Sequence, residues 1–71
     1  MRAITAISGT DKRLRVSVSR LNVPGHPTHE YVVELTAEEN WATYDLQGVL
    51  LGEHGMLGQA LSSCLAGEYD E

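Results

Sequence analysis

The chain has 71 residues and a net charge of −5 at pH 7, so it forms one small domain near the lower size limit for a self-supporting core. Its single cysteine, Cys64, excludes an internal disulfide and is typical of a reducing compartment, so we expect a cytoplasmic protein. All five basic residues lie within the first twenty positions, and nine of the ten acidic residues follow them. This segregation predicts a polarised particle, with a cationic front and anionic helices behind it, that docks on a charged macromolecule.

Two amino-terminal segments have the alternation of β-strands. Residues 12–21 place apolar residues on one face and arginine or serine on the other. Residues 2–7 are similar, and the turn composition of residues 8–11 predicts an antiparallel hairpin. Because Ile4 and Ile7 have opposite parity, either one of them faces solvent or a bulge shifts the register.

A third strand is expected after a loop. Residues 22–29 contain both prolines and predict an exposed loop. Residues 30–35 then alternate again, with Tyr31, Val33 and Leu35 facing inward. We expect this segment to pair with the second strand.

The hydrophobic period changes at Thr36. Thr36 and Glu39 have the spacing of a capping box, which predicts a helix over residues 37–50. Apolar residues spaced by three and four predict a second helix over residues 56–65, and Gly67 is placed to cap its end.

These elements predict an α+β fold in which a three-stranded antiparallel meander is followed by two α-helices packed on one of its faces. Residues 1–71 would form a single domain, with an acidic tail over residues 68–71 that frays. Trp41 is either a core aromatic beneath the sheet or an interface anchor, and the absence of phenylalanine favours the core. The small core also leaves a homodimer open.

The first candidate surface is basic and consists of Lys12, Arg13, Arg15 and Arg20. These side chains would bind phosphates or an acidic partner. Alternatively, the arginines of the second strand pair across the sheet with Glu30 or Glu34 and keep that face soluble. If Leu21 lies opposite Glu30, Ser17 lies opposite Glu34.

The expected order of three strands and a helix, over residues 2–51, resembles the small DNA-binding domain of some phage and transposon integrases. There a sheet enters the major groove, so the resemblance implies nucleic acid as a partner of the basic hairpin. The acidic helices behind the sheet oppose attraction to duplex DNA, so nucleic-acid binding ranks second.

The second candidate surface is acidic and consists of Glu34, Glu38, Glu39, Asp45 and Glu53. It would dock on a basic protein surface. The alternative is a solvated helical face without a specific role. Glu38 and Glu39 do not form a general acid–base pair, because adjacent helix residues point in different directions.

No catalytic, metal-binding or cofactor-binding motif accompanies these surfaces. His26, His29 and His54 with Cys64 would supply four zinc ligands, but the first two fall in the expected loop. Cys64 lies on the apolar stripe of the second expected helix, where a cysteine acts as a small hydrophobe. We therefore expect no metal, no cofactor and no enzymatic activity.

A very short, acidic, single-domain chain with a small sheet and two helices resembles the phage-encoded anti-CRISPR inhibitors. The resemblance covers size, charge and element order and includes no motif, so it assigns no residue. It implies a non-enzymatic inhibitor or accessory factor that occludes a nucleic-acid-binding or docking surface. The expected partner is a protein or protein–RNA complex with a basic surface, and no membrane is involved.

Overall fold

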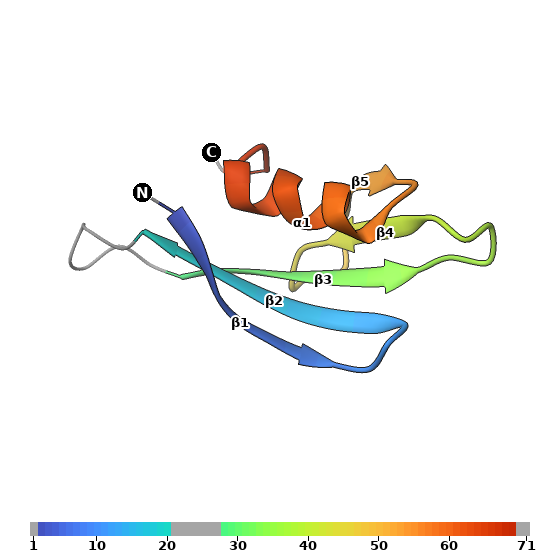
Figure 1. Ribbon diagram of the computed structural model, residues 1–71, viewed down its shortest axis with the longest axis horizontal. Coiled ribbons are helices and arrows are strands. Elements are labelled where there is room, and N and C mark those ends of the chain that lie inside the picture. The colour runs from blue at the N-terminus through green and yellow to red at the C-terminus, as the bar shows by residue number, and fades with distance from the viewer. Residues whose placement is uncertain (1, 21–27, 70–71) are drawn as a thin grey trace.

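The computed structural model describes residues 2–20 and 28–69. Its strands form one antiparallel sheet in chain order, with α1 lying across one face of that sheet (Figure 1). The elements are β1 (Arg2–Gly9), β2 (Arg13–Arg20), β3 (His29–Leu35), β4 (Trp41–Tyr44), β5 (Leu50–His54) and α1 (Leu57–Ala66). The described residues include no helix of the length and apolar character that crossing a bilayer requires.

The predicted fold is wrong in its element count, although the broad α+β class holds. The sheet has five strands rather than three, and one helix packs on it rather than two. Residues 37–50, expected as the first helix, form a turn, β4, a second turn and the first residue of β5. The order of three strands and a helix, on which the resemblance to integrase domains depended, is therefore absent.

The turn between β3 and β4 explains why the capping-box pattern failed. The Asn40 N–H donates to Thr36 Oγ1 at 3.1 Å, and the Thr36 N–H donates to the Asn40 carbonyl at 2.7 Å. Glu39 has φ 64, a left-handed conformation that an α-helix cannot contain. The threonine therefore caps a tight turn, and the Trp-Ala-Thr-Tyr segment after it pairs as a strand.

The turn between β4 and β5 is organised by Asp45. Its Oδ1 accepts the N–H groups of Gln47 at 2.8 Å and Val49 at 3.0 Å. Gly48 has φ 85, which glycine adopts without steric cost. A carboxylate that bonds its own backbone two and four residues ahead favours a turn over a helix, so β4 ends here.

The hairpin of β1 and β2 contains a bulge, which is one of the two alternatives that the parity of its isoleucines allowed. Ile4 lies opposite Val18 and Ile7 opposite Val16, with the register shift between Ile4 and Ala6. Both isoleucines therefore face the same side of the sheet. The alternative in which one of them faces the opposite side is excluded.

The core lies between α1 and the sheet face that α1 covers, which we call the inner face. Val16, Val18, Tyr31 and Val33 on that face are buried together with Ala60 and Cys64 of α1. The inward orientation predicted for Tyr31 and Val33 is confirmed, and so is the apolar role of Cys64. Trp41 packs against this cluster, as expected of a core aromatic.

The end of the chain continues the core beyond α1. Gly67 caps the helix with φ 76, as predicted. Fraying was expected over residues 68–71, but Tyr69 packs against the core cluster. Residues 70–71 lie outside the described part of the chain, as do residues 22–27 of the predicted loop. His29, expected in that loop, begins β3.

Candidate functional site

The face of the sheet away from α1, called the outer face, has no helix over it in the described part of the chain (Figure 1). Its centre is an apolar row that crosses three strands. Val32 of β3 lies opposite Tyr44 of β4, and Tyr44 lies opposite Leu50 of β5. Leu46, Val49 and Leu50, at and beside the β4–β5 turn, are 55%, 54% and 52% exposed. Tyr44, Leu46 and Leu50 thus lie with Val32 on the uncovered side of the sheet.

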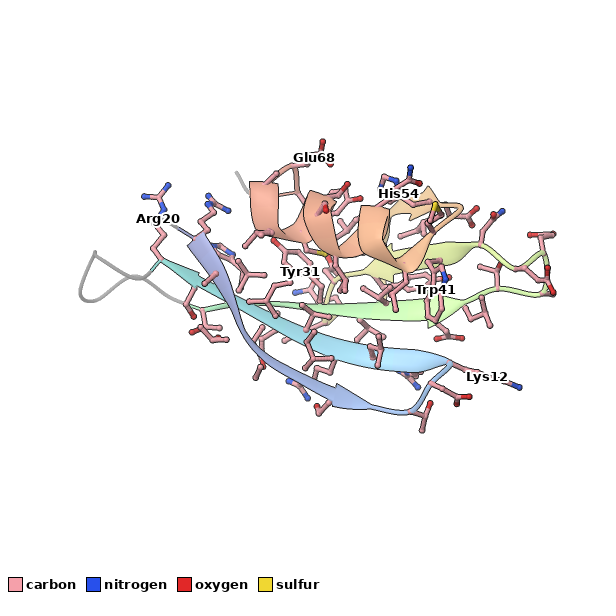
Figure 2. All side chains as sticks on the ribbon, viewed as in Figure 1. Lys12, Arg20, Tyr31, Trp41, His54 and Glu68 are labelled. Atoms are coloured by element: carbon pink, nitrogen blue, oxygen red, sulfur yellow. The ribbon has the colours of Figure 1, made fainter. Side chains whose placement is uncertain are left out.

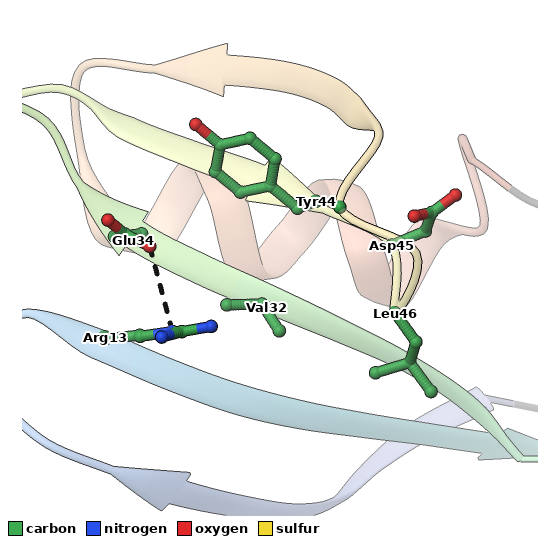
Figure 3. A pocket seen from close by; sticks show the side chains of 7 residues that line it. Arg13, Val32, Glu34, Tyr44, Asp45 and Leu46 are labelled. Atoms are coloured by element: carbon green, nitrogen blue, oxygen red, sulfur yellow. Dashed lines mark ion pairs between the residues drawn. The ribbon is translucent and has the colours of Figure 1, made fainter.

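A shallow cavity of about 240 Å³ lies beside this row (Figure 3). Its lining residues come from β2, β3, β4 and the β4–β5 turn: Arg13, Val32, Glu34, Tyr44, Asp45, Leu46 and Gly48. A second hollow of about 230 Å³ shares Arg13 and Val32 with the first and extends toward β1. The two hollows give the outer face a recessed surface that extends from β1 to β4.

Two ion pairs border the apolar row. Arg13 Nε lies 3.8 Å from Glu34 Oε2, and Arg15 donates to Glu30 Oε2 at 3.1 Å. Ser17 Oγ also donates to Glu30, at 3.4 Å. Pairing of these arginines with Glu30 and Glu34 was the alternative prediction for the basic residues, and it is confirmed. The assumed register is wrong, because Ser17 lies opposite Glu30 and Arg13 opposite Glu34.

The five residues of the predicted acidic surface do not share a helix. Glu34 and Glu53 both lie beside Ala42 on the outer face. Asp45 lines the cavity from the β4–β5 turn. Glu38 and Glu39 lie in the turn between β3 and β4. The structure therefore brings three of the five acidic residues to the outer face and leaves the other two at a turn.

The predicted basic residues are spread along the sheet. Arg13 and Arg15 lie on the outer face, whereas Lys12 and Arg20 lie at opposite ends of β2 (Figure 2). The expected anionic helical rear is also wrong, because α1 has no charged residue. Both signs of charge meet on the outer face. Lys12, Arg13, Arg15 and Arg20 therefore do not form the cation-only patch that nucleic-acid binding would use.

The apolar residues of this face were not singled out from the sequence. Tyr44, Leu46 and Leu50 all fell inside the helix expected over residues 37–50. Their grouping depends on strand pairing between β3, β4 and β5. The one local signal for this arrangement was the β-favouring segment that includes Thr43 and Tyr44.

A second polar cluster lies on the inner face, between β5 and the end of the chain. His54 Nε2 lies 3.0 Å from Ser63 Oγ and 3.2 Å from the Tyr69 hydroxyl. Ser63 is only 8% exposed, and both hydroxyls meet the same ring nitrogen. This geometry joins α1 and Tyr69 to β5. It differs from that of an activated nucleophile, in which an exposed hydroxyl and an orienting group hold different nitrogens.

Within residues 2–20 and 28–69, no three histidine, cysteine or acidic side chains are grouped so that they could hold a metal ion. Of the four zinc ligands considered above, His26 lies outside the described residues, and Cys64 is buried in the core. Comparison of the chain with protein-family models, curated proteins and solved structures returned no match.

Proposed function

We propose that this protein is a non-catalytic protein-binding module that docks through the outer face of its sheet. The observation that supports this most directly is the uncovered row of Val32, Tyr44 and Leu50 beside a recessed surface. Exposed apolar side chains rimmed by polar groups are typical of protein-binding surfaces. Tyrosine at the centre of such a patch is a frequent energetic anchor.

The charges around this row favour a basic partner. Four carboxylates border this row or lie near it, and they belong to Glu30, Glu34, Asp45 and Glu53. Two guanidinium groups, those of Arg13 and Arg15, lie in the same region. Both arginines already face carboxylates of the same sheet. This excess of negative charge is part of the net charge of −5, and a cationic protein surface complements the outer face.

Binding of this kind suits an inhibitor or accessory factor of a protein or protein–RNA complex in the cytoplasm. By covering a basic channel or docking surface, a rigid domain blocks access without chemistry. This role is the one implied by the resemblance to phage-encoded anti-CRISPR inhibitors in size and charge. Nucleic acid is the less favoured partner, because Arg13 and Arg15 are engaged by Glu34 and Glu30.

The test compares capture of a partner by matched surface variants. The immobilised protein is exposed to a host extract, and captured proteins are identified by mass spectrometry. Tyr44→Ser and Leu50→Ser should each weaken capture of a specific basic protein by about tenfold or more. Met56→Ser is the control, because Met56 is 65% exposed but precedes α1 and lies outside the apolar row.

Capture that survives both outer-face substitutions, or is lost equally in the Met56 control, would contradict docking through this face. Duplex DNA serves as the second probe. A salt-sensitive shift of duplex DNA that disappears on replacing Arg13 and Arg15 with alanine would instead support the nucleic-acid alternative.

A further inference from the structure

The cavity on the outer face combines an apolar floor with an aromatic wall. Val32 lies opposite Tyr44, and Leu46 borders the same hollow from the β4–β5 turn. The hollow has a volume of about 240 Å³, which is roughly eight times the volume that one water molecule occupies in the liquid. It therefore has room for a long side chain. Apolar walls favour a side chain with a methylene stem, which arginine and lysine both possess.

Glu34 supplies a carboxylate at this cavity with unused acceptor capacity. Among the described residues its one ionic neighbour is Arg13, at 3.8 Å, which exceeds hydrogen-bond length. By contrast, the Glu30 carboxylate accepts from both Arg15 and Ser17. Glu34 is also 49% exposed at its side chain, so an incoming cation can reach it. An added donor would therefore meet an acceptor that is not yet satisfied by the protein.

The remaining lining groups favour a guanidinium over an ammonium. Tyr44 projects from β4 on the same side of the sheet as Glu34 and Val32 (Figure 3). A planar guanidinium stacks on a tyrosine ring and also donates in a fork to a carboxylate, whereas an ammonium is a strongly hydrated point charge. Asp45 adds negative charge, although its Oδ1 is occupied by two turn N–H groups.

We propose that this cavity is the anchor site for one arginine side chain of the basic partner. Its methylene stem would lie on Val32 and Leu46, its guanidinium plane on Tyr44, and its N–H groups would donate to Glu34. The incoming guanidinium replaces Arg13 as the cation beside Glu34, so Arg13 competes with the ligand. This inference rests on the proposed function, because it names the group by which the partner is recognised.

The direct test uses small probes and the intact protein. Capped arginine amide and capped citrulline amide are titrated separately while backbone amide signals are followed by NMR. Citrulline has nearly the same shape but no charge. Arginine should produce saturable shifts centred on Glu34, Tyr44 and Leu46, and citrulline should bind at least about tenfold more weakly. Equal effects of the two probes, or no arginine-specific shift, would overturn the proposal.

Two substitutions should change arginine affinity in opposite directions. Glu34→Gln should weaken binding of the arginine probe by about tenfold, since it removes the acceptor charge. Arg13→Gln should strengthen binding by a few fold, because it removes the competing cation. If Arg13→Gln instead abolishes binding, or a capped glutamate binds in place of arginine, the cavity is an anion site and the proposal fails. Thermal unfolding of each variant establishes that it is folded.

The two proposals fail in different ways. If capture of the partner is sensitive to Leu50→Ser but the arginine probe does not bind, docking through the outer face stands and the anchor does not. If the probe binds as expected but the outer-face variants capture the partner normally, the cavity binds arginine but does not anchor the partner. In that case docking through this face is wrong.

Discussion

The ring of Tyr69 meets the ring of Tyr31 edge to face, with centroids 6.0 Å apart and planes inclined by 63°. Tyr31 is 4% exposed at the centre of the sheet, whereas Tyr69 follows the left-handed turn at Gly67. The last described residue of the chain is thus a covering element of the core. A small domain has few such contacts to lose.

Removal of the Tyr69 ring should therefore destabilise the domain. Tyr69→Ala is expected to lower the free energy of unfolding by about 2–4 kcal/mol, through lost burial and the lost ring pair. Tyr69→Phe should cost about 1 kcal/mol, since only the contact with His54 is removed. Urea denaturation measures both, with Glu68→Ala as a near-neutral control. Equal stability of Tyr69→Ala and the Glu68→Ala control would show that the Tyr69 ring does not support the core.

Thr43 carries a buried hydroxyl with no hydrogen-bond partner within the described residues. Thr43→Val replaces that hydroxyl with a methyl group, so we expect the free energy of unfolding to rise by about 1 kcal/mol. Thr43→Ser keeps the hydroxyl but removes a methyl group, and it should destabilise by about 1 kcal/mol. Denaturant midpoints of the unchanged protein and the two variants give their order of stability. If Thr43→Val is less stable than the unchanged protein, the Thr43 hydroxyl has a hydrogen-bond partner.

Glu39 is the non-glycine residue with a positive φ, 64, in the described part of the chain. Glu39→Gly should stabilise the protein by about 0.5–1 kcal/mol, because glycine adopts this conformation without the steric cost of a Cβ. The matched control is Glu38→Gly in the same turn, which has no positive φ and should lose stability through backbone entropy. Thermal unfolding compares them. The same sign of effect at both positions would contradict this account.

Gly9 ends β1 with φ 119, and a Cβ placed there would collide with the Arg13 carbonyl group. Gly9→Ala should therefore destabilise the protein by more than about 2 kcal/mol. Gly55→Ala is the control, because a Cβ at Gly55 meets nothing within 4 Å and its φ is not positive. Chemical denaturation of both variants checks the difference. If Gly9→Ala leaves the free energy of unfolding unchanged, the β1–β2 turn relaxes easily around the added methyl group.

The amino-terminal half of the fold could be predicted because its strands are long and the buried residues of β2 and β3 alternate with outward-facing ones. In β2 and β3, apolar residues repeat at every second position, so both the strand type and the buried face followed from the pattern. The bulge near Thr5 was one of the two alternatives that the opposite parity of Ile4 and Ile7 allowed, and the strand pairing decides between them. The exact pairing of β2 with β3 did not follow, because alternation indicates which face of a strand is buried and does not indicate which residues lie opposite one another.

The second half failed because β4 and β5 have only four and five residues. That length is too short for alternation to outweigh a helix-start signal such as Thr36 with Glu39. The same threonine satisfies a backbone N–H in a helix cap or in a tight turn, so composition alone does not separate the two. The cavity was missed with these strands, since Tyr44 reaches Val32 only across the β3–β4 pairing.

The neutral composition of α1 determines how the molecule presents itself at a distance. Because Leu57–Ala66 carries no ionised side chain, the helix itself contributes little to the external potential. Four of the described carboxylates, those of Glu30, Glu34, Asp45 and Glu53, instead lie on or beside the outer face, and Glu38 and Glu39 lie in the β3–β4 turn. A cationic body diffusing nearby is therefore drawn toward the uncovered strands before any contact forms. Productive encounters should slow as ionic strength rises.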